Sequence, residues 1–169
     1  MEQIIAVEVV VGGSRAAVRR AAGALRDSER RVATFERLVP MPEHIRSAGQ
    51  IKGGRFSAPE QLDWAREHWG AESDMLDYQL RSDSSHGLII NYCVVGDIPI
   101  KIMRELARRF PGVSLHGTGS VGANEIVIGS FASSQGVGRL NVDLMPKPAS
   151  IFCAGRPPRP DDRGAVAFA

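Results

Sequence analysis

The sequence is poor in cysteine, in aromatic residues and in long apolar runs, and each shortage excludes a class of protein. Cys93 and Cys153 are the two cysteines among 169 residues; they form no C-x-x-C pair and cannot build a disulfide framework. The apolar run near the N-terminus is short and interrupted by Glu8, and Glu2 stands where a secretory signal has basic residues. We therefore expect no export signal and no membrane span, and a reducing cytoplasm as the location.

The chain also lacks a large net charge. The total is +2, so the composition does not predict generic binding to nucleic acid. The charges are unevenly placed, however: residues 1–57 carry ten basic and six acidic side chains, whereas residues 58–83 carry two basic and seven acidic ones. The acidic block is either a solvated face or a patch that docks a basic partner.

Patterns typical of metal sites are missing. No pair of histidines has the i, i+4 spacing or the H-E-x-x-H arrangement that brings two imidazoles to one ion. We expect isolated surface or strand-face histidines, with a site assembled by the fold as the alternative; the four are His44, His68, His86 and His116. The acids that loosely resemble a calcium loop lack its spacing and closing glutamate: Asp74, Asp77 and Asp83.

Patterns typical of catalysis are equally weak. Residues 117–122 match G-x-G-x-x-G, but the residues after them have β character, which predicts a hairpin turn instead of a dinucleotide loop. Serines occur without a G-x-S-x-G elbow. Cys93 lies within an apolar strand, where a structural buried thiol is expected. We predict no catalytic residue, cofactor or metal, and an enzyme with a fold-assembled site remains a third hypothesis.

Hydrophobic periodicity predicts a series of strands and helices. In the first strand Ile5, Val7, Val9 and Val11 line one face. Ser14 is the predicted N-cap of the following helix. The predicted order is a strand at 4–11, a helix at 15–26, a strand at 34–39, an insertion at about 41–86, a strand at 88–95, a helix from Asp97 to Phe110, and strands at 113–116 and 125–131.

The insertion contains a helix of its own. Ser57 followed by Glu60 is typical of a capping box, and Gly70 is placed to end the helix. The fold class is thus α+β, with a ferredoxin-like βαββαβ core, an extra C-terminal strand and a helical insertion. Residues 1–132 form the domain, and residues 133–169 form an irregular Gly/Pro-rich arm.

Two phrases in the chain resemble a known family. The stretch 35–43 (FERLVPMPE), followed by 63–70 (DWAREHWG), is similar to the YubB-like family, as is the segment Asn91–Gly117. The resemblance covers roughly residues 1–132. The family continues its Trp-Gly with Thr-Lys-Trp, where this chain has Ala71-Glu72-Ser73. The resemblance implies a small ferredoxin-like domain carried by plasmids and phages, and an accessory role such as inhibition of a host defence complex.

The leading functional hypothesis is binding of a protein partner without catalysis. The acidic insertion holds both tryptophans, and aromatic anchors within a polar rim are typical of interfaces. The candidate contact residues are Trp64, Glu67, Trp69, Glu72, Asp74, Asp77 and Tyr78.

The second hypothesis is nucleic-acid binding through a basic helix face formed by Arg15, Arg19 and Arg26. Base stacking on the sheet is disfavoured because the outward residues of the first strand include no aromatic side chain.

Overall fold

The computed structural model describes residues 3–27, 32–82, 87–122, 126–134, 136 and 139–144. Its elements are β1 (Ile4–Gly13), α1 (Arg15–Leu25), β2 (Arg26–Asp27), β3 (Val32–Ala33), the 3-10 helix η1 (Phe35–Arg37), α2 (Glu43–Arg46), β4 (Ile51–Lys52), β5 (Arg55–Phe56), α3 (Pro59–His68), β6 (Leu76–Ser82), β7 (Leu88–Val95), α4 (Ile100–Arg109), β8 (Val113–Val121), β9 (Ile126–Ser133) and β10 (Asn141–Leu144). The predicted α+β class is confirmed.

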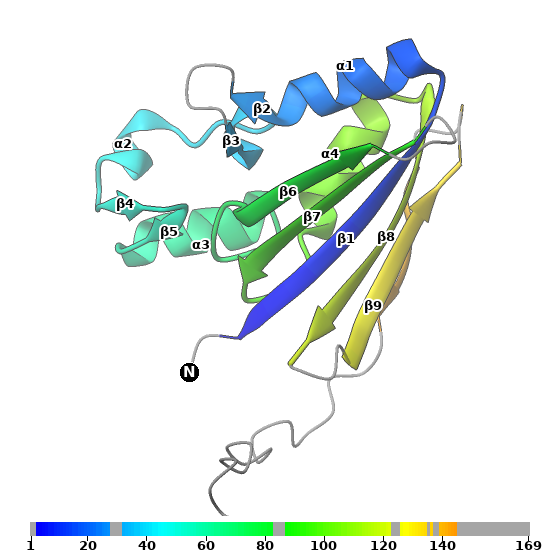
Figure 1. Cartoon of the computed structure of the whole chain (residues 1–169). Coiled ribbons are helices and arrows are strands. Elements are labelled where there is room, and N and C mark those ends of the chain that lie inside the picture. The colour runs from blue at the N-terminus through cyan, green and yellow to red at the C-terminus, as the bar shows by residue number, and fades with distance from the viewer. Residues whose placement is uncertain are drawn as a thin grey trace, which may run out of the picture.

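A six-stranded antiparallel sheet forms the centre of the fold. Its strand order is β10-β9-β8-β1-β7-β6, with two small hairpins, β2–β3 and β4–β5, outside it. Helices α1 and α4 lie on one face of this sheet, and the hairpins and α3 lie beyond its β6 edge (Figure 1). No helix in the described part of the chain has the length and apolar character needed to cross a membrane.

The predicted alternation of β1 is confirmed, and it determines where the core lies. Ile5, Val7, Val9 and Val11 are each at most 2% exposed because they face α1 and α4. Ser14 caps α1 as predicted, accepting a hydrogen bond from the Ala17 amide at 3.3 Å.

The strand predicted at 34–39 is wrong, because residues 35–37 form η1 and residues 38 and 39 follow it in a turn and a bend. The Thr34 hydroxyl accepts a hydrogen bond from the Glu36 amide at 3.1 Å and so caps a helical turn. Thr34 thereby competes for the backbone groups that a strand would pair.

Two strands of the sheet come from segments that we predicted otherwise. β6 lies inside the predicted helical insertion and pairs with β7 at one sheet edge. β10 lies inside the predicted irregular arm and pairs with β9 at the other edge. The remainder of that arm, from residue 145, lies outside the described residues, as do Cys153, His86 and Asp83.

The predicted starts of the two later helices are also wrong. α3 begins at Pro59, with Ala58 as its N-cap. The Gln61 side chain accepts hydrogen bonds from the amides of Ser57 and Ala58, just before the helix, at 3.3 and 3.2 Å. The helix predicted to start after Asp97 begins at Ile100.

The glycine-rich segment 117–122 is mostly strand and not a turn. β8 continues to Val121, and only Gly122 lies in the turn. A Cβ atom on Gly117 would lie 2.2 Å from the Phe131 ring, and one on Gly119 would lie 2.5 Å from Ile98. These glycines are therefore required because large core side chains pack directly on the strand.

Candidate functional site

A groove runs beside the first half of edge strand β6. It has a volume of about 1100 Å³, and its lining includes Ala33 of the β2–β3 hairpin together with Ile51 and residues 53–56 of the β4–β5 hairpin. Its polar and aromatic lining comprises Thr34, Glu36, Arg37, Arg46, Arg55, Phe56, Asp74, Asp77 and Tyr78.

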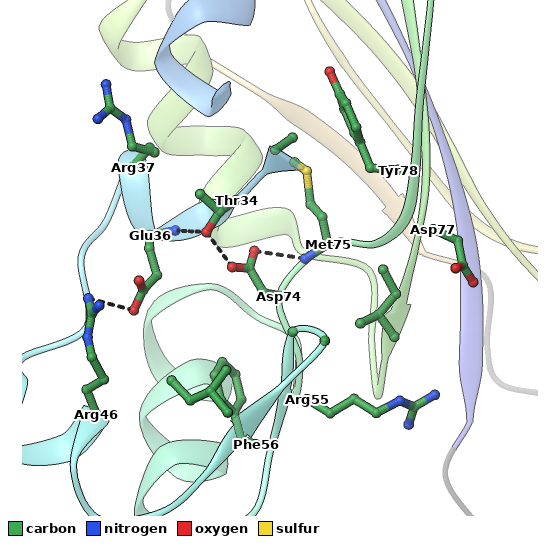
Figure 2. A pocket seen from close by; sticks show the side chains of 15 residues that line it. Thr34, Glu36, Arg37, Arg46, Arg55, Phe56, Asp74, Met75, Asp77 and Tyr78 are labelled. Carbon is green, nitrogen blue, oxygen red and sulfur yellow. Dashed lines mark hydrogen bonds and ion pairs between the residues drawn. The ribbon is translucent and has the colours of Figure 1, made fainter. Parts of the chain in front are cut away.

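Asp74 joins η1 to the chain that leads into β6. Its Oδ1 accepts hydrogen bonds from the amides of Phe35 at 2.7 Å and Met75 at 2.8 Å, and its Oδ2 accepts one from the Thr34 hydroxyl. Figure 2 shows this carboxylate between Thr34 and Met75. Three donors thus hold it in place.

Burial changes the proton affinity of this group. Loss of solvation raises the pKa of Asp74 from 3.8 to about 6, against the lowering effect of its three hydrogen bonds. A carboxyl group with such a pKa can exchange a proton near neutral pH, as acid–base catalysis requires. Its hydrogen bonds to Thr34, Phe35 and Met75 also give it an evident structural task.

The hairpin β4–β5 docks on the segment just before β6. The Asp74 amide donates to the Gly54 carbonyl at 2.9 Å, and Arg55 forms an antiparallel bridge with Ser73. The Ser73 hydroxyl in turn accepts from the Val95 amide at 2.9 Å. These bonds fix the hairpin along the line of β6, where it forms one end of the groove.

An ion pair lines another part of the groove. Arg46 Nη2 lies 2.8 Å from Glu36 Oε1, and Arg46 Nε lies 3.6 Å from Glu43. Arg37 and Arg55 extend away from Asp74 (Figure 2). The groove therefore presents both signs of charge within a small area.

The sheet side of the groove is the start of β6. Asp77 is exposed with φ = 49°, and the pairing of β6 with β7 is irregular between Leu76 and Gln79. Tyr78 follows it and is half-buried, and this burial raises the pKa of its hydroxyl, while Arg26 acts in the opposite direction. Among the described residues β6 pairs only with β7, so its other edge has backbone groups without a ladder partner.

The groove brings together three of the seven predicted contact residues: Asp74, Asp77 and Tyr78. Trp69 is 0% exposed, and its Nε1 donates to the Val39 carbonyl at 2.9 Å. It packs edge-on against Phe35, with ring centroids 5.6 Å apart. Trp69 as a surface anchor is therefore wrong, because the aromatic residues beneath the groove enclose it.

The other three predicted residues lie around α3. Trp64 is half-buried and stacks on His68 with 4.2 Å between ring centroids. Glu72 forms an ion pair with Arg66, with 3.0 Å between Oε1 and Nε. Glu67 is exposed, and its carbonyl accepts from the Lys101 ammonium at 2.6 Å. These residues do not line the groove.

Residues 33–56 supply most of the groove but were not predicted to belong to a site. Thr34, Arg37, Arg46 and Arg55 come from η1, α2 and β5, which are too short to leave a periodic pattern. The available signal was the Gly53-Gly54 pair, typical of a hairpin turn, where φ is 57° and 82°.

The remaining predicted sites are dispersed. Arg15 and Arg19 are exposed on α1, while Arg26 lies just beyond its end in β2. The described histidines are isolated, and no group of three or more described His, Cys, Asp or Glu side chains gathers as a metal site would. Cys93 is half-buried on the uncovered sheet face, less buried than predicted, and this burial raises the pKa of its thiol.

Comparison of the chain with models of protein families, with curated proteins and with solved structures finds no match. The resemblance to the YubB-like family therefore stays a prediction.

Proposed function

We propose that this protein is a binding module that receives an extended segment of a partner protein along β6 and in the adjoining groove. The observation that carries the proposal is the coincidence of an unpaired strand edge with a groove of about 1100 Å³ lined in part by two hairpins. An extended peptide added to a sheet edge gains affinity from main-chain hydrogen bonds, and neighbouring pockets supply specificity.

The chemistry of the groove fits such a guest. Arg37 and Asp77 offer opposite charges to the side chains of a bound strand, and Tyr78 offers an aromatic face with a polar tip. Leu80, further along β6, is 39% exposed, so an apolar side chain is available at the same edge. The exposed backbone would supply affinity, and these side chains would select the sequence.

We further infer a fold relationship and a biological setting. Strands β1, β6, β7 and β8 with α1 and α4 would form the ferredoxin-like core, to which β9 and β10 are added. The setting is that of a cytoplasmic accessory protein of a mobile element, and the bound partner would belong to a host defence complex. The resemblance of residues 35–43 and 63–70 to a plasmid and phage family supports this setting.

The test uses peptides selected on the immobilised protein from a random 12-residue display library. Hydrogen exchange of the protein is measured with and without a selected peptide. Strand addition is expected to slow exchange at amides within Tyr78–Arg81, because the outward N–H groups gain partners. Protection confined to α3 would contradict the proposal and favour the acidic helix surface.

Matched variants test the groove and the surface of α3 independently. Asp77→Asn with Tyr78→Ala removes one charge and one aromatic ring from the groove, and Asp77→Asn retains a residue type that tolerates positive φ. We expect at least a tenfold loss of peptide affinity, on the order of the contribution of an interface anchor. Glu67→Gln on α3 is the control and should leave affinity unchanged.

A further inference from the structure

The outer surface of the two sheet-covering helices is basic. Six arginines on this surface are exposed: Arg15, Arg19 and Arg20 on α1, and Arg104, Arg108 and Arg109 on α4. The two helices contain one acidic residue between them, Glu105. We call these six arginines the arginine layer; they concentrate positive charge in a chain whose total is +2.

The two helices lie on the same side of the molecule. Both pack on the same face of the sheet (Figure 1), and each contacts β8. The chain that leaves α4 returns beside α1: a Cβ atom on Gly112 would lie 3.6 Å from that of Ala17. The end of α4 therefore lies close to the start of α1, and both sets of arginines are on the same side of the sheet.

The single acid does not neutralise this layer. Glu105 is held by Arg108 at 2.7 Å and Arg109 at 2.6 Å. Hydrogen bonds from Arg108 and Arg109 lower the pKa of Glu105 to about 2. Arg15, Arg19, Arg20 and Arg104 form no ion pair with any residue that the structure describes.

The composition of the surface favours phosphate over a protein partner. Protein interfaces depend on apolar and aromatic anchors. Among the described residues, none of the exposed large hydrophobic side chains lies on α1 or α4. They lie on strands and the β4–β5 hairpin: Ile4, Ile51, Leu80, Ile126, Val127 and Leu144. Contact with a nucleic-acid backbone needs charge alone. Arginine is also the side chain whose planar donors fit phosphate oxygens in pairs.

We propose that the arginine layer binds the phosphate backbone of nucleic acid, without reading its sequence. This site is separate from the groove beside β6, which lies at the sheet edge, so either proposal can fail alone. Binding should depend steeply on salt, because each phosphate contact releases counterions.

The experiment measures fluorescence anisotropy of a labelled 20-base-pair DNA duplex at several salt concentrations. The triple variant Arg15→Gln, Arg19→Gln, Arg104→Gln changes exposed side chains without ion pairs to described residues, so the fold should persist, and circular dichroism verifies it. We expect affinity at low salt to fall by at least tenfold and the salt slope to become shallower by about one per arginine.

The control is Arg81→Gln, compared with Arg19→Gln. Arg81 pairs with Ile89 in the sheet, on the face that α1 and α4 leave uncovered, so this variant removes the same charge elsewhere. Equal losses for the two variants would show a net-charge effect and overturn the proposal. Absence of binding at low salt would overturn it as well, and so would tighter binding of a poly-glutamate peptide than of the duplex.

Discussion

At the residue scale, two side chains show how environment decides a role. Asp74 and Asp77 are three positions apart in one acidic segment, yet Asp74 is held by three donors and Asp77 is exposed. Their sequence neighbourhoods are alike, so the difference arises from the hairpin and η1 that close over Asp74. The candidate site could be predicted as an acidic segment, but not which of its carboxylates is buried.

The raised pKa of Asp74 predicts a specific pH dependence of stability. Between pH 3.8 and about 6 the folded protein retains a proton on Asp74 that the unfolded chain has lost, so this group makes stability fall as pH rises through that window. The loss is complete above about 6 and amounts to about 3 kcal/mol for a shift of this size. Asp74→Asn keeps an acceptor for both amides and removes the titration.

Urea unfolding of wild type and Asp74→Asn at pH 4, 5, 6 and 7 measures the effect. The variant should gain in stability relative to wild type as pH rises across this range. Parallel pH profiles would show that the carboxyl group is not perturbed by folding.

Gly117 predicts a steric effect on the core. A methyl group at this position would overlap the Phe131 ring at 2.2 Å, so Gly117→Ala should lower the free energy of unfolding by about 1–3 kcal/mol. Phe131→Leu in the same chain should recover part of that loss. Gly23→Ala is the control: apart from its chain neighbours and the backbone of its own helix, no described atom lies within 4 Å of its Cβ position in α1, and it should stabilise by about 0.5–1 kcal/mol.

At the element scale, the start of α3 depends on one buried amide. Gln61 is 0% exposed; its Oε1 accepts from Ser57 and Ala58, and its Nε2 donates to the carbonyls of Arg46 at 2.7 Å and Gly49 at 3.2 Å. The sequence predicted a helix that starts near this position, but it did not identify the side chain that holds the helix start. Sequence spacing cannot show that the loop 46–49 folds back onto the helix start.

Gln61→Ala should therefore destabilise the protein far more than a change at the predicted capping residue. Removing the amide leaves the Ala58 N–H and the carbonyls of Arg46 and Gly49 without this partner, whereas the Ser57 N–H keeps the Gln50 carbonyl at 3.2 Å; the expected cost is about 2–3 kcal/mol. Glu60→Gln, on the exposed side of the same turn, should change stability by less than about 0.5 kcal/mol. Urea denaturation of both variants distinguishes the two capping schemes, and equal losses would contradict the structure.

At the scale of the whole molecule, the segment between η1 and β7 is part of the main core. Trp69, from this segment, packs against Phe35, and Phe35 packs against Tyr92 of β7 with ring centroids 5.8 Å apart. β6 from the same segment is a strand of the main sheet. These contacts show that the segment packs into the domain and does not project from it as an independent insertion.

One cooperative unfolding transition should result. Tryptophan fluorescence reports the segment 59–69, and far-ultraviolet circular dichroism reports the sheet and helices together. Their urea midpoints should coincide, because the aromatic contacts couple the two parts. Fluorescence that changes at clearly lower urea would indicate that the segment unfolds separately.

The sequence by itself determined the elements whose periodicity is long enough to bury one face. The alternation of β1, the apolar run of β7 and the four-residue spacing of α4 depend on local geometry, and each predicted element is present. Only the tertiary structure decided the rest. β10, η1 and the hairpins are too short to leave a period, and β6 is recognisable only through its pairing with β7. The groove arises where these segments meet, because contacts between residues about forty positions apart, such as Thr34 with Asp74, have no signature in local sequence.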